Sequence, residues 1–221
     1  MKDPRAQNLW FLAPGLSHLL GNALFTVQGR ARLLAMATAD GSSDPEQVGE
    51  DVRAVLDGSA RAMVSLSVLR WLLGEGKPSA AACGVVVREL VDVARVPLRD
   101  HAMSLELTFV DCREQDEVDP NDLAYAWTSV LRLLCGLPHG EPLRIDVQVR
   151  GSEQAVRLDV RCCLAERDTA TARPLGLLYD AFAREQDASP SALANVRVAI
   201  NESLDMLILS LPVLRPSFSP S

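Results

Sequence analysis

The sequence predicts an α+β fold, in which an N-terminal antiparallel helical hairpin forms a dimeric four-helix bundle and is followed by an α/β sandwich. Two long stretches between residues 7 and 73 carry apolar residues at steps of three and four, which predicts the hairpin. A stretch of small residues at 74–82 separates them from a region of mixed periodicity. We therefore place the hairpin domain at 1–76, the sandwich domain at 83–214 and a disordered tail at 215–221.

The first predicted helix spans about residues 7–36, and Pro14 and Gly15 allow a bend in it. Its apolar stripe is formed by Leu16, Leu20, Ala23, Val27, Ala31 and Leu34. At about 100° per residue, His18 falls opposite this stripe. The same outer face continues with Asn22, Phe25, Gly29 and Arg32. An aromatic residue in line with an exposed histidine suggests a docking surface, although spacing alone favours an ordinary solvated face.

The second predicted helix follows a turn at residues 40–43. The run Ser43-Asp44-Pro45-Glu46 is typical of a capping box with proline at the helix start. Gly74 and Gly76 are expected to end this helix. Each helix has a wider apolar stripe than one hairpin seam can bury, so the pattern predicts a homodimer.

The sandwich is predicted from shorter patterns. Helical spacing is expected at 87–94 and at 123–134, the latter opening after Asp119-Pro120. Alternating apolar residues predict a strand at 105–109 and a hairpin of strands at 143–149 and 156–162 around Gly151. Ser189-Pro190 is expected to cap a third helix through about Asn201, before a last strand at 206–211.

Composition narrows the class of function. The net charge of −7 and pI of about 5.0 make nucleic acid an unexpected partner, because a phosphate-binding face needs clustered Lys and Arg. Five irregularly spaced cysteines without a C-x-x-C pair predict neither a zinc site nor a disulfide framework. No run reaches the roughly 18 apolar residues of a membrane span. We expect a cytoplasmic protein with no membrane partner.

One segment resembles the phosphoacceptor helix of sensor histidine kinases, which carries a Ser-His-Glu-Leu/Ile-x-Asn-Pro-Leu run. The matching positions are Ser17, His18, Leu20, Asn22 and Leu24. Two positions depart from that pattern, since Leu19 replaces the acidic residue beside the histidine and Ala23 replaces the proline.

A second resemblance covers nearly all of residues 83–214, which are similar to the ATP-binding domain of histidine kinases, the GHKL fold. The run 119–123 (DPNDL) is similar to the opening of the nucleotide-binding helix. The run 178–182 (LYDAF) is similar to the F-E-P-F box, and LILSLP is similar to the closing strand. The two domains occur in the order found in the family.

The residues that handle the nucleotide in that family are missing here. Ser129 and Leu133 stand where N-x-x-x-N would hold magnesium and ATP, and leucine cannot ligate a hard cation. Cys162 stands where the aspartate of D-x-G-x-G is expected, and the second glycine loop is reduced to residues 190–193. The resemblance therefore implies a degenerate domain with no bound ATP and no metal.

The combined pattern is similar to dimeric histidine phosphotransferases of bacterial phosphorelays in two-component signalling. That resemblance implies that His18 is the phosphoacceptor, that Asn22 hydrogen-bonds near it, and that Phe25, Gly29 and Arg32 contact the receiver domain. The receiver would supply the aspartate and the Mg²⁺. Two alternatives stay open: a non-catalytic pseudokinase scaffold that binds or sequesters a response regulator or a kinase, and an active sensor kinase with atypical nucleotide contacts.

Overall fold

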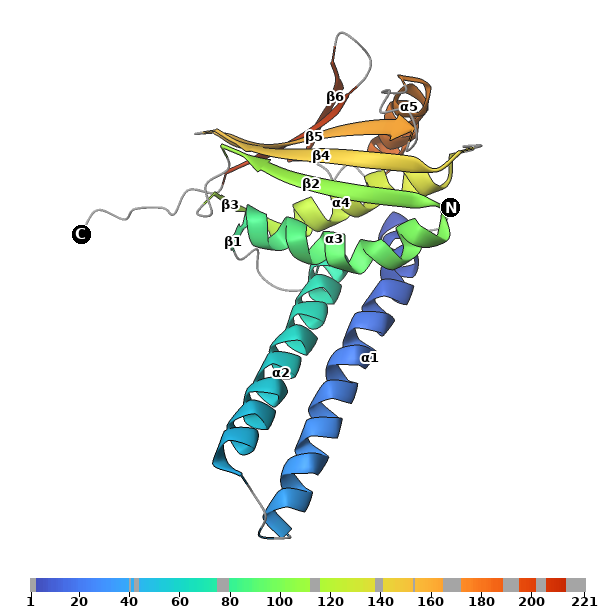
Figure 1. The fold of residues 1–221 in the computed structure, drawn as a ribbon. Coiled ribbons are helices and arrows are strands. Elements are labelled where there is room, and N and C mark those ends of the chain that lie inside the picture. Colours follow the sequence, from blue (N-terminus) through green and yellow to red (C-terminus); the bar gives the residue numbers. More distant parts are fainter. Residues whose placement is uncertain are drawn as a thin grey trace, which may run out of the picture.

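A computed structural model of the chain describes residues 3–39, 41, 44–74, 80–111, 116–137, 141–152, 154–164, 172–188, 195–201 and 206–213. It combines helices and sheet, as the α+β prediction requires (Figure 1). The helices are α1 (Pro4–Ala39), α2 (Pro45–Leu73), α3 (Cys83–Asp100), α4 (Pro120–Cys135) and α5 (Ala172–Ala188). The strands are β1 (Ala81–Ala82), β2 (Met103–Val110), β3 (Glu117–Val118), β4 (Leu143–Gly151), β5 (Ala155–Leu164), β6 (Arg197–Ile200) and β7 (Leu207–Pro212).

Helices α1 and α2 form the predicted antiparallel hairpin, which projects from the rest of the molecule (Figure 1). The carboxylate of Asp44 accepts a hydrogen bond of 3.0 Å from the backbone N–H of Glu46 and so caps α2, with Pro45 in the first turn. Ser43 lies outside the described residues. Gly74 ends α2 with a φ of 67°, which glycine adopts without a Cβ clash.

Helix α1 continues through Pro14 and is longer at both ends than the predicted 7–36. Gly15 is the point at which α1 crosses α3. A Cβ atom at this position would lie 1.8 Å from the carbonyl oxygen of Val93. Only a residue without a side chain allows the two helix backbones to approach so closely.

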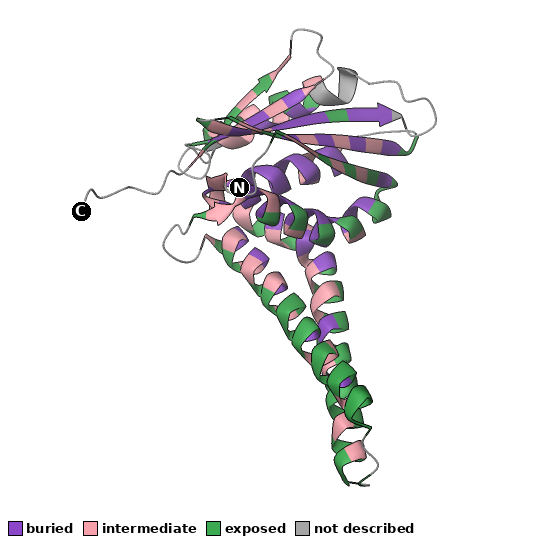
Figure 2. Ribbon diagram, turned by 60° about the vertical axis from the view of Figure 1, so that its left-hand side comes forward, coloured by how far each residue is buried: buried purple, intermediate pink, exposed green. Residues whose placement is uncertain are grey.

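A five-stranded sheet of order β2-β4-β5-β7-β6 forms the second layer, with β2 parallel to β4 and the other neighbours antiparallel. Helices α3 and α4 cover one face, the face nearer the hairpin (Figure 1). Alternate residues of the central strands point into this core. Figure 2 shows burial concentrated there, while the hairpin is exposed along most of its length. The inward residues of β4 and β5 are Leu143, Ile145, Val147, Val149, Val156, Leu158, Val160 and Cys162.

The predicted helix over 189–201 is wrong in its described part. Residues 197–200 form β6, which pairs antiparallel with β7, with Val198 opposite Leu209. The helix of this region instead spans 172–188 and contributes Leu178 and Phe182 to the core. The short alternating run at 197–200 is stabilised by its neighbour strand, a tertiary effect that helical spacing does not reveal. Residues 189–194 and the tail 215–221 lie outside the described residues.

Among the described residues, no helix combines the length and the apolarity that crossing a membrane requires.

Candidate functional site

The site is built on the outer face of α1, where His18 is exposed to solvent as predicted. The side-chain nitrogen Nδ2 of Asn22 lies 3.1 Å from Nε2 of His18, one helical turn away. An amide nitrogen donates, so in this contact Nε2 is the acceptor and carries the lone pair. The geometry presents an imidazole nitrogen that can act as a nucleophile.

The remaining predicted residues of this face are also exposed. Phe25 has 78% of its surface in contact with solvent, and Gly29 and Arg32 are exposed below it. A Cβ atom at Gly29 would meet nothing within 4 Å. The structure thus places these side chains on one open surface, whereas their contact with a receiver stays a prediction.

Packing explains the leucine at position 19, the residue that replaces the acidic neighbour of the histidine and lies about 100° around α1 from it. Leu19 is half-buried and packs against the hydrophobic core. Leu16 packs there too, and Ala23 is buried in the hairpin seam. Ala31, which was assigned to the same stripe, is exposed. Because α3 lies over the upper part of α1, an apolar residue at position 19 is favoured by packing.

A groove of about 750 Å³ borders this site and was not predicted from the sequence. It lies between α1, α2 and α3, and Leu19, Asn22 and Thr26 form its α1 wall. Charged residues form much of the rest: Asp57, Arg61, Arg88, Glu89, Asp92 and Arg95. The signal in the sequence was the polar spacing of residues 88, 89, 92 and 95, which recur by threes and fours on an otherwise apolar helix.

Glu89 is the unusual group of this groove. Its Oε2 atom is buried and has no hydrogen-bond partner. Burial of the carboxyl group disfavours its charged form and raises the pKa of Glu89 to about 6. The neighbouring carboxylate of Asp92 instead pairs with Arg95 at 3.2 Å.

The residues assigned to a degenerate nucleotide site, Ser129, Leu133 and Cys162, are buried or half-buried in the described part of the chain. Ser129 is fully buried on α4, and its hydroxyl donates a 2.7 Å hydrogen bond to Oε1 of Glu185 on α5. The same hydroxyl accepts a 2.8 Å bond from the Nδ2 atom of Asn8 on α1. Its proton and one lone pair are therefore committed to groups of this chain.

Ser129 belongs to a buried polar network that fastens the hairpin to the sandwich. Nε of Arg132 donates to Oδ1 of Asn8 at 2.8 Å, and its other end forms an ion pair with Glu185. The hydroxyl of Tyr125 donates to Glu185 as well, at 3.3 Å. Asn8 itself has no exposed surface. The network joins α1, α4 and α5, and its buried polar groups find their hydrogen-bond partners within the chain.

Leu133 and Cys162 lie in apolar surroundings. Leu133 is half-buried and packs against the core. Cys162 is fully buried on the inward face of β5, opposite Ile145 of β4, and burial is the main cause that raises the pKa of its thiol to about 12. In the part of the chain that the structure describes, no group of three His, Cys, Asp or Glu side chains is placed to hold a metal ion.

Comparison with known proteins finds no matching family model and no curated protein that matches in sequence. Among solved structures, the chain is similar to the Acinetobacter baumannii histidine kinase AdeS, with 13% identity, a TM-score of 0.37 and coverage of 89% of this chain and 96% of that chain. It is also similar to the catalytic domain of the histidine kinase ThkA in a nucleotide-free form, with 13% identity, a TM-score of 0.42 and coverage of 62% and 97%. TM-scores below 0.5 at this identity do not establish a family for the chain.

Proposed function

We propose that this protein is a phosphorelay histidine phosphotransferase, which passes a phosphoryl group between His18 and receiver-domain aspartates without ATP-dependent autokinase activity. The observation that carries the proposal is the exposed imidazole of His18, whose Nε2 accepts the amide of Asn22 at 3.1 Å. The resemblance of residues 17–24 to a phosphoacceptor helix supports the same conclusion.

The transfer requires little from the histidine side. The Nε2 lone pair attacks the phosphorus of an aspartyl phosphate, so that a P–N bond forms while the P–O bond to the aspartate breaks. The electron pair of the broken bond leaves with the carboxylate, and no proton has to be removed from Nε2. Asn22 is then placed to donate to a phosphoryl oxygen instead of to the ring. Mg²⁺, supplied by the receiver, would balance the charge of the phosphoryl group.

Autophosphorylation of the histidine from ATP has less support than phosphotransfer. Leu19 offers no carboxylate beside the histidine and is packed toward the core. Ser129 is hydrogen-bonded within the chain, and Cys162 is buried in an apolar layer. These observations favour transfer over autophosphorylation.

The proposal includes a homodimer. An apolar groove of about 360 Å³ lies between α1 and α2, lined by Leu9, Trp10, Ala13, Leu16, Ser17, Leu20, Ser65, Leu66 and Leu69. Trp10 is 79% exposed there, and the hairpin of a second copy would bury this side chain. Leu20 lies about 160° around α1 from His18. His18 is not among the residues that line this groove, so we expect pairing through it to leave the histidine accessible to a receiver.

The test is transfer from receiver domains of the source organism, loaded with radiolabelled phosphate by a small-molecule donor and incubated with the full chain. We expect acid-labile, base-stable label on the wild type, equal label on His101→Ala and none on His18→Ala. His101 is the matched control because it is also an exposed histidine. Transfer from no receiver would favour the scaffold alternative. Labelling from Mg-ATP alone would show that the chain is a kinase.

A further inference from the structure

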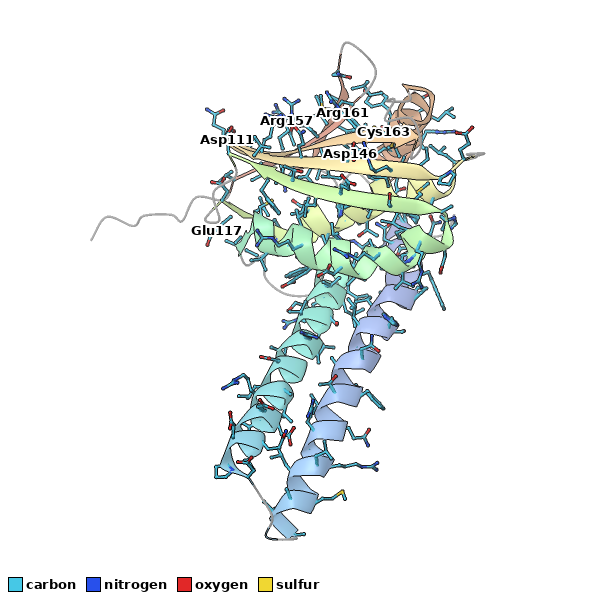
Figure 3. The ribbon with its side chains drawn as sticks, viewed as in Figure 1. Asp111, Glu117, Asp146, Arg157, Arg161 and Cys163 are labelled. Atoms are coloured by element: carbon cyan, nitrogen blue, oxygen red, sulfur yellow. The ribbon has the colours of Figure 1, made fainter. Side chains whose placement is uncertain are left out.

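The face of the five-stranded sheet that is turned away from the hairpin carries charged side chains that the proposed phosphotransfer does not use. Figure 3 shows Asp146, Arg157, Arg161 and Cys163 on this side of β4 and β5. These residues alternate with the inward apolar positions of the same strands. Helices α3, α4 and α5 pack their buried side chains against the inward positions of the strands. No described helix covers the outward face of the sheet.

Four arginines of this face form what we call the arginine patch: Arg150, Arg157, Arg161 and Arg197. The strand register aligns three of them in one row across the sheet. Arg150 of β4 is opposite Arg157 of β5, which is opposite Ser210 of β7, which is opposite Arg197 of β6. Residues that are opposite in register project from the same face, so the three guanidinium groups share one surface.

One carboxylate organises half of the patch. Asp159 is only 4% exposed, pairs with Nε of Arg150 at 3.1 Å, and forms a second ion pair with Arg157. Two guanidinium groups thus share a single negative charge and are held in a fixed orientation. Two further carboxylates lie on the same face: Asp146, which is opposite Arg161 in register and pairs with Arg144 at 2.9 Å, and Glu106 of β2, which is opposite Asp146. Arginines still outnumber carboxylates on this face, although the whole chain has a net charge of −7.

The other half of the patch forms no ion pair within the described residues, although Asp146 is opposite Arg161 in register. Arg161 and Arg197 are exposed, and neither makes a side-chain hydrogen bond or ion pair within the described residues. A hollow of about 490 Å³ lies beside Arg197, and Gln154, Asn195 and Ser210 are among the residues that line it. Polar groups and a free guanidinium therefore surround a concave part of the surface, which suits a partner with negative side chains.

We propose that the arginine patch is a docking surface for an acidic helix of a partner protein. Adjacent strands lie about 4.8 Å apart, so Arg150 and Arg157 are about one strand spacing apart and Arg157 and Arg197 about 10 Å apart. Carboxylates one turn apart on a helix are separated by about 5–6 Å, and those at i and i+7 by about 10.5 Å. A helix with acidic residues at these intervals matches the row.

Nucleic acid is a poorer fit to the same patch, because the overall charge of −7 repels a long polyanion more strongly than a short helix with a few carboxylates. The patch also lies on the far side of the helix layer from the hairpin (Figure 1). The surface is therefore separate from His18, and its partner can bind without covering the histidine.

The experiment uses the full chain and a fluorescent alanine-based peptide of about 15 residues with glutamates at i, i+4, i+7 and i+11, against a matched peptide with glutamines. Binding is measured by fluorescence anisotropy. We expect the glutamate peptide to bind at least about tenfold more tightly than the glutamine peptide at about 0.05 M salt, with most of the difference lost at about 0.3 M.

The decisive variant is Arg161→Glu with Arg197→Glu, because neither side chain has a partner whose loss would disturb the fold. Its matched control is Arg53→Glu with Arg99→Glu, two exposed arginines outside the sheet. We expect the patch variant to lower peptide affinity at least about tenfold and the control to change it less than about twofold. Labelling of His18 should be the same in both, so failure here is distinguishable from failure of the proposed phosphotransfer.

Three results would overturn the proposal. Equal binding of the glutamate and glutamine peptides removes the electrostatic basis. Equal losses in the patch and control variants show that only net charge matters. Salt-sensitive self-association in sedimentation, abolished by the patch variant, assigns the surface to a second copy of this chain instead.

Discussion

Two polar clusters on helix α1 differ in their burial and in their hydrogen-bond partners. The side chains of His18 and Asn22 lie in solvent and contact each other, whereas Asn8, about three turns earlier, is fully buried and hydrogen-bonded to α4. The buried cluster has donors and acceptors matched within the chain, and such matching is what a folded interior requires. In the exposed cluster the Nε2 lone pair is held by a solvent-exposed amide, which can turn away when a partner binds. Helix α1 therefore has two roles. Its N-terminal part, around Asn8, fixes it to the sandwich, and its outer face, around His18, is accessible to a partner.

The largest expected effect comes from the buried cluster. Arg132→Ala would remove the ion pair of the largely buried Glu185 carboxylate, which would keep the hydroxyl donors of Ser129 and Tyr125 but no positive partner in this network. We expect a loss of about 3–5 kcal/mol in the free energy of unfolding. Urea denaturation followed by circular dichroism measures this change. The control is Arg53→Ala, an exposed change for which we expect less than about 0.5 kcal/mol. A loss no larger than the control would show that the network does not hold the two layers together.

The second effect concerns the close crossing of α1 and α3. Gly15→Ala would place a Cβ atom 1.8 Å from the Val93 carbonyl oxygen, so the helices must move apart, at a cost of about 1–3 kcal/mol. Gly21→Ala is the matched control, since a Cβ there meets nothing within 4 Å and a mid-helix alanine should stabilise by about 0.5–1 kcal/mol. Thermal melts of the two variants should shift in opposite directions. Shifts in the same direction would contradict the crossing geometry.

A smaller effect is expected at the groove beside the histidine. The folded-state pKa of Glu89, about 6, lies above the ordinary value of 4.5, so the folded protein binds the proton more tightly than the unfolded chain does. Stability is therefore lost as the pH rises from about 4.5 through 6, and removing the charge should restore it.

We expect Glu89→Gln to raise the free energy of unfolding by up to about 1 kcal/mol at pH 7.5, after allowance for solvent screening, and to change it little at pH 4.5. Urea titrations at the two pH values test this. Equal effects at both would show that Glu89 is solvated like an ordinary surface residue.

The smallest effect is predicted for the exposed face itself. Phe25→Ala should leave the free energy of unfolding within about 0.5 kcal/mol of the wild type, because the ring is 78% exposed. Transfer from a phosphorylated receiver should nevertheless slow by about tenfold if the ring belongs to the docking surface. An unchanged transfer rate would remove Phe25 from that surface.

The local features of this chain could be predicted from its sequence. The exposure of His18 and Phe25 follows from helical spacing, and the alternation of β4 and β5 follows from period-two patterning. The cap at Asp44 and the end at Gly74 likewise depend on residues a few positions apart. In each case the interaction that fixes the structure lies within one or two turns of the chain.

The rest depends on contacts between distant residues. The bond between Asn8 and Ser129 spans 121 positions, and no local pattern marks asparagine 8 as a buried partner. The groove around Glu89 exists only because α3 crosses the hairpin. The strand at 197–200 is four residues long and was predicted as helix, since its conformation depends on β7. These features required the tertiary structure.

The central claim is that phosphate resides on Nε2 of His18, and site mapping tests it most directly. The full chain is incubated with a phosphorylated receiver, digested under basic conditions and analysed by mass spectrometry that preserves phosphohistidine. We predict the phosphate on the peptide containing His18, with no phosphate on His101. Phosphate on His101, or transfer that persists in the His18→Ala variant, would contradict the account.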